Sequence, residues 1–319
     1  MTNRESIHLT GRDLTAAMIE AVASGATVTT DPHSLEQMQR SREVVQRAAQ
    51  SNQPIYGVTT GLGPKVTEAL PRDAVDSFSV NTIRGRNHAV GSPLPVPWVR
   101  AGMVVRINTL LSGAAGARPQ LAEHIALCLN HQITPLIPET GTIGVADLSW
   151  GGAFGSAMIG EGKVQLSDGT VTSAVDAFNG ANIKAFTPQL REGLALVSHS
   201  CFTGGISALA WSRLWRSFQA TQVAGALSME AFRASLTPLD ERVLRLRPQR
   251  GQIHAARQLL QLLEGSALLK AGTARRLQDP LSIRNMVQVH GGVQATLDLL
   301  EQAVTDEING ASDLSLIHI

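Results

Sequence analysis

The sequence predicts a mainly α protein in which a small, loop-rich N-terminal head of mixed α/β character precedes a bundle of long helices. Three observations predict this class. The first 60 residues mix β-like and helical patterns, and a Pro/Gly-rich stretch at 134–155 follows. From Gln189 onward strand signals vanish, and long helical runs carry small residues at spacings suited to close helix packing.

The head begins with two short segments of strand character, "SIHL" and "ATVTT". Apolar residues recur at helical spacing after Leu14 and again after Ser34. Ser34 and Gln37 have the spacing of a capping box, so we expect the second helix to begin there.

A helical pattern covers 97–132 and is broken near Gly113, Gly116 and Pro119. These three residue types interrupt or end helices, so the pattern predicts more than one helix.

The Pro/Gly-rich stretch 134–155 is interpreted as a loop, and its Ile, Leu and Trp side chains indicate more than a linker. "KVQLSDGTVTS" predicts a β-hairpin in which Asp168 and Gly169 supply two positive-φ turn residues. Beyond the first long run, further helices are expected at about 252–277 and 286–309. The domains predicted are a head at 1–188 and the first part of a central bundle at 189–313.

Composition excludes several classes of protein. Lys+Arg 27 against Asp+Glu 26 leaves a net charge of +1, so we expect no nucleic-acid partner. Cys128 and Cys201 both lie in apolar, helical-looking segments, which suits a reducing compartment. The N-terminus lacks a signal-peptide pattern and Arg106 and Arg118 interrupt the most apolar stretch, so we expect a cytoplasmic protein with no membrane segment and no metal.

The last six residues, "LSLIHI" at 314–319, match the in-frame translation of a common sequencing adapter. An ordinary apolar tail is the alternative. On the adapter interpretation the natural chain continues beyond Asp313, and the present chain is a fragment of it.

Tyr56 is the only tyrosine and lies in "YGVTTGLG", where three glycines predict an irregular loop that lets a ligand approach the backbone. A phenol at such a place can act as a general acid or base. A packed turn tyrosine is the alternative, and the residues alone favour it.

Nine motifs in order resemble the aromatic amino acid lyases, with histidine ammonia-lyases as the nearest members. The resemblance covers about Tyr56 to Asp313. The motifs are "YGVTTGLG", "NHAVG", "RINTLLSG", "PLIPETGTIG…DLS", "GEGK", "REGLAL", "QRGQI", "QDPLSIR" and "EINGASD". The resemblance implies a homotetrameric carbon–nitrogen lyase that removes an amine and a β-proton from an aromatic amino acid.

The resemblance also implies roles for residues. Tyr56 matches the base, Arg284 the arginine that binds the substrate carboxylate, and Gln278 a supporting polar residue, while Leu281 stands where the family usually has tyrosine. A bidentate guanidinium suits a carboxylate, although a salt bridge within the bundle is the alternative for Arg284.

Asn87 and His88 match the pair that contacts the substrate ring, and histidine-specific members carry histidine there. A polar pair suits a hydrogen-bonding ring such as imidazole. The alternative for His88 is a capping histidine at a turn.

The family's electrophile, methylidene-imidazolone (MIO), forms from an Ala-Ser-Gly tripeptide, and this chain departs from that pattern. "GTIG" is followed by Val145-Ala146 and then Asp147-Leu148, so the loop Gly144, Val145, Ala146, Asp147 is one residue short and lacks the serine and glycine. Ser198 replaces the asparagine that supports the electrophile. We therefore expect no MIO group and no other cofactor.

Three functions follow from these features. The leading interpretation is a lyase that works without MIO, resembling ergothionases, with a trimethylated histidine-like betaine as substrate and trimethylamine as the leaving group. The second is an ordinary histidine or aromatic amino acid ammonia-lyase that releases ammonia. The third is a catalytically silent homologue that binds a ligand or pairs with an active subunit.

Overall fold

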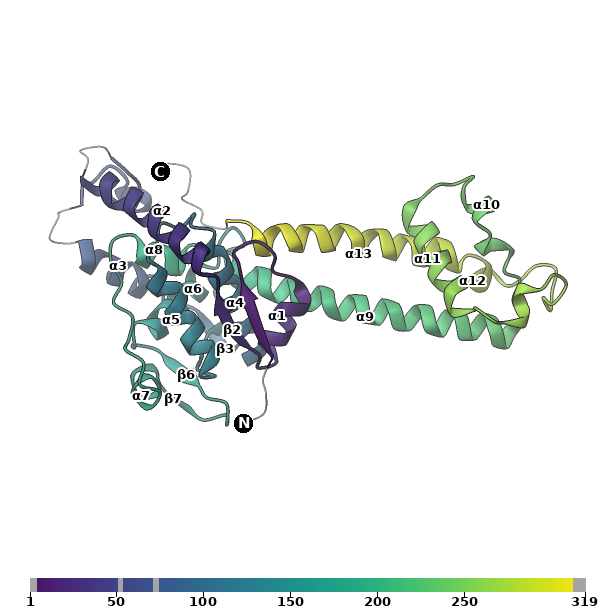
Figure 1. Cartoon of the computed structure of the whole chain (residues 1–319), viewed down its shortest axis with the longest axis horizontal. Helices are drawn as coiled ribbons and strands as arrows, with labels where there is room; N and C mark the ends of the chain where they lie inside the picture. The colour runs from purple at the N-terminus through teal and green to yellow at the C-terminus, as the bar shows by residue number, and fades with distance from the viewer. Residues whose placement is uncertain (1–4, 51–53, 71–74, 312–319) are drawn as a thin grey trace. The chain divides into compact units, whose positions relative to one another are not determined.

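The computed structural model describes residues 5–50, 54–70 and 75–311, and it confirms a mainly α protein with few, short strands (Figure 1). The chain divides into two compact units: Met1–Leu209 with Val304–Ile319, and Ala210–Ala303. The sequence-based division after residue 188 differs from these units and stays a prediction about domains. The six residues interpreted as adapter lie outside the described residues.

The first unit contains most of the predicted head. Its helices are α1 (Ala16–Ala23), α2 (Pro32–Gln50), α3 (Val75–Arg84), α4 (Val96–Leu111), α5 (Pro119–Asn130), α6 (Leu148–Met158), α7 (Ala174–Gly180) and α8 (Glu192–Val197), with the short 3-10 helix η1 (Gly63–Lys65). Its strands are β1 (Ser6–Leu9), β2 (Thr27–Thr30), β3 (Val90–Pro93), β4 (Thr134–Pro135), β5 (Pro138–Thr140), β6 (Lys163–Gln165) and β7 (Val171–Ser173).

The strands form three small sheets. β1 and β2 pair in parallel through the α1 crossover, with Ser6 opposite Thr27. β3 pairs with β5, and β4, β6 and β7 form an antiparallel sheet in that order. The core lies between the helices, where every residue of α4 from Val99 to Leu111 is buried.

The buried Arg100 of α4 ties this core to the β1–α1–β2 unit. Its guanidinium donates to three carbonyls: Nε to Val22 at 2.9 Å, NH1 to Leu129 at 3.2 Å and NH2 to Ala26 at 3.4 Å. The charge is thus placed at the carboxyl ends of α1 and α5, where the helix dipoles favour a cation.

The expected start of α2 was wrong. The helix begins at Pro32, and the Asp31 carboxylate accepts from the Ser34 amide at 2.8 Å, while Gln37 donates to the Ser112 carbonyl instead of closing a capping box. Asp31 followed by proline is itself a strong start signal, because proline suits the first helical position and the carboxylate caps the free amides.

The hairpin of β6 and β7 is confirmed, but its turn differs from the expected one. Of the two predicted positive-φ residues only Gly169 has φ +86°, and the Asp168 carboxylate accepts from the Thr170 amide at 2.9 Å.

The interpretation of 134–155 as a loop was also wrong in part. It contains β4 and β5, and its last third opens α6, whose residues from Ser149 to Met158 are all buried. A helix buried on every side has no polar face, so it lacks the periodicity that identifies a surface helix.

The run after residue 189 is broken at Ser198–Ser200, where α8 ends and α9 (Cys201–Phe232) begins. The second unit holds most of α9, then η3 (Thr237–Leu239), α10 (Glu241–Leu244), α11 (Arg250–Leu262), η4 (Ala267–Leu269), α12 (Leu281–Arg284) and most of α13 (Met286–Asn309). The helix expected at about 252–277 therefore ends at Leu262, whereas that expected at 286–309 is confirmed.

By length and apolar composition, one helical stretch in the described residues, Glu192–Phe232, could cross a membrane. Core helices pass the same test, and 67% of the most apolar window of this stretch is buried within the structure.

A buried histidine makes the stability depend on pH. His124 packs against Phe178 and Phe186, and burial lowers its pKa from 6.5 to about 4. Between these values the unfolded chain binds more protons than the folded one, so stability rises with pH over that range. His124→Phe should remove on the order of 2–3 kcal/mol from the rise in unfolding free energy between pH 4 and 6.5, measured by urea unfolding.

The wild-type chain, unfolded in urea over the same pH range, provides the reference. An unaltered pH dependence in His124→Phe would show that the imidazole is not the titrating group.

Candidate active site

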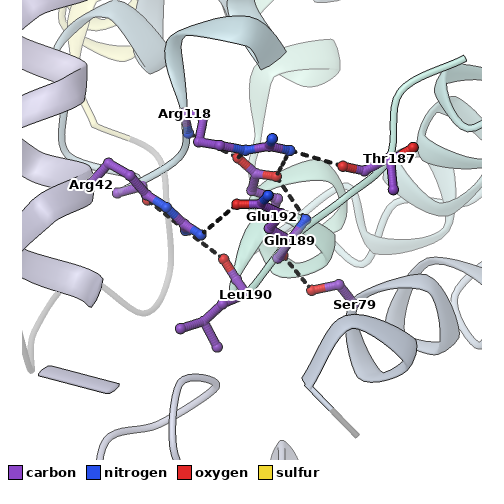
Figure 2. A network of polar contacts seen from close by, with 8 residues as sticks. Arg42, Ser79, Arg118, Thr187, Gln189, Leu190 and Glu192 are labelled. Atoms are coloured by element: carbon purple, nitrogen blue, oxygen red, sulfur yellow. Dashed lines mark hydrogen bonds and ion pairs between the residues drawn. The ribbon is translucent and has the colours of Figure 1, made fainter. Parts of the chain in front are cut away.

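Helix α8 supports the candidate site, and a buried ion pair fixes its first residue (Figure 2). Glu192 is fully buried, and each of its carboxylate oxygens accepts two hydrogen bonds. Arg118 donates from its amide and Nε at 2.9 Å to one oxygen and from NH2 at 2.7 Å to the other, which also accepts from the Gln189 amide at 2.8 Å. A buried carboxylate whose two oxygens both accept hydrogen bonds is tolerated in a protein interior, whereas an unpaired buried carboxylate strongly destabilises the fold.

Two further side chains hold the segment that leads into α8 (Figure 2). The buried Arg42 donates to the Leu190 carbonyl at 2.6 Å, and Ser79 donates to the Gln189 carbonyl at 2.7 Å. Arg191 then adopts the left-handed conformation with φ +68°, and its Nε donates to the Ala115 carbonyl at 3.0 Å. The entry into α8 is therefore fixed from several elements at once.

The Tyr56 loop packs on α8. Gly57 has φ +66°, and a Cβ there would lie 3.0 Å from Leu194 of α8. The half-buried Tyr56 accepts a hydrogen bond at its phenol oxygen from the Gly63 amide, 3.1 Å away. The glycines thus place the phenol on an irregular loop beside α8, as the sequence predicted for the loop.

Asn87 and His88 are anchored on helix α6. The Asn87 amide nitrogen donates to Ser156 Oγ at 3.0 Å, and His88 Nε2 lies 2.8 Å from Ser149 Oγ. Gly152 lies between the two serines on the helix, and a Cβ there would come within 2.3 Å of the Arg86 carbonyl group. The missing side chain lets the 86–88 turn lie directly against α6.

A neighbouring face of α6 packs on α8. A Cβ at Gly151 would lie 2.7 Å from the Val197 backbone, and a Cβ at Gly155 would lie 3.4 Å from Leu196. Helix α6 therefore contacts both the 86–88 turn, which we call the ring-contact turn, and α8. Asn87 and His88 are bonded to α6, and Ser198 directly follows α8.

The degenerate MIO loop runs from Gly144 to Asp147 and leads directly into α6. Val145 is exposed, whereas Ala146 and Asp147 are buried, and Gly144 has φ +84°. Ile143 donates from its amide to the Ala146 carbonyl at 3.1 Å, and the Asp147 amide donates to the His199 carbonyl at 2.7 Å. Neither Val145 nor Ala146 carries a hydroxyl whose loss could yield an alkene, so the residues present do not fit the MIO group.

Asp147 fastens this loop to the start of α9. Its carboxylate accepts from the Thr203 hydroxyl at 2.6 Å and from the Thr203 amide at 2.9 Å. Burial raises the pKa of Asp147, and the hydrogen bonds from Thr203 oppose that rise. The carboxylate has a structural role that does not require an electrophile in the loop.

Trp150 stands in the first turn of α6 against the same loop. A Cβ at Gly141 would lie 2.4 Å from Cδ1 and 2.9 Å from Nε1 of the indole. The indole N–H is buried and has no hydrogen-bond partner among the described residues. Gly141 is thus required for the indole to occupy this position.

Ser198 and His199 lie where α8 ends. Ser198 is buried and its amide donates to the Leu194 carbonyl at 2.9 Å. His199 is fully buried, with Nε2 3.1 Å from the Leu196 carbonyl and Nδ1 accepting from the Cys201 amide at 3.3 Å. Burial, followed by the nearby Arg106 charge, lowers the pKa of His199, so this imidazole is neutral and structural.

Gln278, Leu281 and Arg284 belong to the second unit. Arg284 ends α12 and is half-buried, while Gln278 and Leu281 are exposed. The side chain of Arg284 has no hydrogen bond or ion pair with the described residues, so the salt-bridge alternative gains no support. Asp279, the residue after Gln278, is buried, and its carboxylate accepts from the Ser235 amide at 2.7 Å.

The structure therefore gathers four of the predicted features around α6 and α8: Tyr56, the Asn87–His88 pair, the degenerate loop and Ser198. No cluster of His, Cys, Asp and Glu that could hold a metal occurs in the ranges described. Sequence reasoning missed Ser149, Gly152 and Ser156, because 134–155 was interpreted as a loop. Their spacing of three and four residues on one helical face was the available signal.

The fold is mainly α, with the loop of Tyr56 packed on α8 and His88 bonded to Ser149 of the neighbouring helix α6. The sequence model of the aromatic amino acid lyases matches residues 14–318. The chain therefore belongs to the aromatic amino acid lyase family.

Individual relatives support this assignment. The chain is 34% identical over 313 residues, 98% of its length, to a histidine ammonia-lyase of Streptococcus sanguinis. Among solved structures it resembles ergothionase from Treponema denticola in complex with desmethyl-ergothioneine sulfonic acid, with TM-score 0.86 and 26% identity, covering 96% of this chain and 61% of that one. It also resembles tyrosine aminomutase from Streptomyces globisporus, with TM-score 0.87 and 30% identity, covering 97% and 62%. The chain spans 61% of the length of the curated relatives it matches.

Gly152→Ala tests the contact between α6 and the 86–88 turn. The new Cβ would meet the Arg86 backbone at 2.3 Å, and backbone cannot rotate away as a side chain can. The free energy of unfolding should fall by about 1–3 kcal/mol in denaturant titrations, the usual cost of overpacking. Gly180→Ala is the matched control: a Cβ there meets nothing within 4 Å, so stability should stay the same or rise slightly. Equal effects of the two substitutions would contradict the packing described.

Proposed function

We propose that the full-length protein is a carbon–nitrogen lyase that eliminates an amine from a histidine-like aromatic substrate with Tyr56 as the base and without an MIO group. The leading substrate is a trimethylated betaine, from which trimethylamine leaves. Family membership supports the lyase class, and the loop described above supports the mechanism without MIO.

One observation carries the proposal. Between Gly144 and Asp147 the chain has only Val145 and Ala146, so the serine and the glycine from which the electrophile is made are absent. Asp147 stays bonded to Thr203 and its amide to the His199 carbonyl. In this proposal the loop has a hydrogen-bonded frame but no residues from which the electrophile could form.

The chemistry explains why a betaine suits such a site. A primary ammonium leaves poorly and needs an electrophile to assist it. A trimethylammonium group departs unaided: the base takes the β-proton, the C–H electrons form the carbon–carbon double bond, and the C–N pair leaves with neutral trimethylamine. It also has no lone pair with which to add to an alkene.

The residues have distinct roles in this proposal. Tyr56 accepts the β-proton, and Gly63 orients the phenol by donating to its oxygen. His88 contacts the substrate ring and Arg284 binds the carboxylate through a bidentate fork. Gln278 and Ser198 each stand where the family has a polar residue of its active site, as the resemblance implies.

A second function is favoured by a specific observation. Histidine ammonia-lyases are 32–34% identical to this chain, and an ordinary member of that class would release ammonia from unmodified histidine. A silent homologue that only binds ligand is the third candidate. A homotetrameric state and a cytoplasmic location belong to the proposal as well.

The absence of MIO can be measured directly. Since Val145 and Ala146 lack the groups needed for cyclisation and dehydration, intact-mass and peptide analysis should find residues 141–148 at their unmodified mass, without loss of two waters. Ultraviolet difference spectra should lack an MIO band. A mass deficit localised to this segment would refute the proposal.

A substrate panel separates the three functions in the full-length protein. Trimethylated histidine should release trimethylamine, and histidine should release no ammonia, because only the quaternary amine leaves unassisted. Both amines are assayed in parallel. Ammonia from unmodified histidine would support the ordinary lyase, and release of neither amine from any substrate would support the silent homologue.

Tyr56→Phe is the control for base catalysis in that panel. It keeps the ring but removes the only phenol in the chain. Turnover should fall by roughly 10²–10⁴-fold, the range expected when a positioned acid–base group is lost. Undiminished trimethylamine release would exclude Tyr56 as the base.

A further inference from the structure

Two buried serines on α6 hold the two neighbouring side chains of the ring-contact turn. Ser149 Oγ lies 2.8 Å from His88 Nε2, and Ser156 Oγ accepts from the Asn87 amide at 3.0 Å. The serines are 4% and 2% exposed. Gly152 between them allows the turn to come close enough for both hydrogen bonds.

The two bonds direct the side chains to different places. Ser149 is the second residue of α6 and is separated from the degenerate loop by Leu148 alone, whereas Ser156 lies two helical turns further on, about 10 Å along the axis. His88 is therefore held beside the loop, and Asn87 is held away from it. Of the predicted ring-contact pair, His88 is the one placed next to the loop.

Ser149 is itself firmly placed. Its amide donates to the Gly141 carbonyl at 3.0 Å, which ties the first turn of α6 back to the start of the loop. The His88 side chain is exposed, and Ser149 bonds its Nε2. The imidazole is thus anchored through one nitrogen, and its Nδ1 is left to contact a ligand.

We propose that Ser149 is a positioning residue that determines ring specificity, because it fixes the His88 imidazole so that Nδ1 meets a polar ring edge. The ligand class is an azole rather than a phenyl ring. An azole supplies both a hydrogen-bond donor and an acceptor, so either tautomer of His88 finds a partner, whereas a phenyl ring would leave Nδ1 unpaired. This proposal rests on the proposed function only for the location of the site.

Binding of four probes tests the proposal in the full-length protein. The probes are histidine, phenylalanine and the trimethylated betaine of each, titrated by calorimetry in a Tyr56→Phe background so that no turnover occurs. The measured quantity is the ratio of Kd values, phenyl over imidazole, within each pair. This ratio does not depend on which amine the enzyme releases, so failure of the trimethylamine mechanism leaves the test intact.

Ser149→Ala should lower the ratio about tenfold, the effect of one lost hydrogen bond of roughly 1.4 kcal/mol. Ser149→Thr keeps the hydroxyl and should restore the ratio to within about threefold. Ser34→Ala is the matched control, because Ser34 is 5% exposed and its Oγ donates to the Thr10 carbonyl at 2.8 Å in the same unit. That substitution should leave the ratio unchanged.

A double-mutant cycle decides whether Ser149 acts through His88. If it does, Ser149→Ala has no further effect on the ratio once His88→Ala is present. Additive effects of the two substitutions would overturn the proposal. So would a wild-type ratio near one, a ratio unchanged in Ser149→Ala, or an equal loss of affinity for all four probes.

Discussion

The ion pair between the half-buried Arg118 and the fully buried Glu192 is the interaction on which the site depends. A carboxylate removed from water carries a desolvation cost of several kcal/mol, which only excellent geometry offsets. Here two donors reach each oxygen, and three of the four come from one arginine through its backbone and its guanidinium. Loss of Arg118 would leave a buried, unpaired charge at the first residue of α8. The ion pair is therefore needed to hold α8 in its position.

Helix α8 is only six residues long, yet three elements pack closely on it, and one of them carries Tyr56. In each case a glycine makes the approach possible: Gly57 for the tyrosine loop, Gly193 for α3 and Gly151 for α6. A Cβ at Gly193 would lie 2.2 Å from the Ser79 carbonyl oxygen, so this contact is between backbones. Such contacts are specific because backbone cannot repack around an added side chain.

The loop Gly144–Asp147 is held by a small set of hydrogen bonds. The Asp147 carboxylate accepts from Thr203 and its amide donates to the His199 carbonyl, while the Ile143 amide donates to the Ala146 carbonyl within the loop. The neutral, buried His199 fills the space behind the loop with Phe154 and Phe202. These hydrogen bonds involve backbone groups and the Asp147 carboxylate, and none of them uses the side chain of Val145 or Ala146.

The sequence by itself determined the features that are local: the mainly α class, the helix at 286–309, the hairpin and the glycine-rich loop of Tyr56. It failed where distant backbone decides the structure. Helix α6 was interpreted as a loop because Gly151, Gly152 and Gly155 suggest turns, whereas in the fold they admit α8 and the 86–88 turn. Only tertiary structure placed Ser149 against His88, 61 residues earlier in the chain, because that bond depends on the close approach of the 86–88 turn to α6 at Gly152.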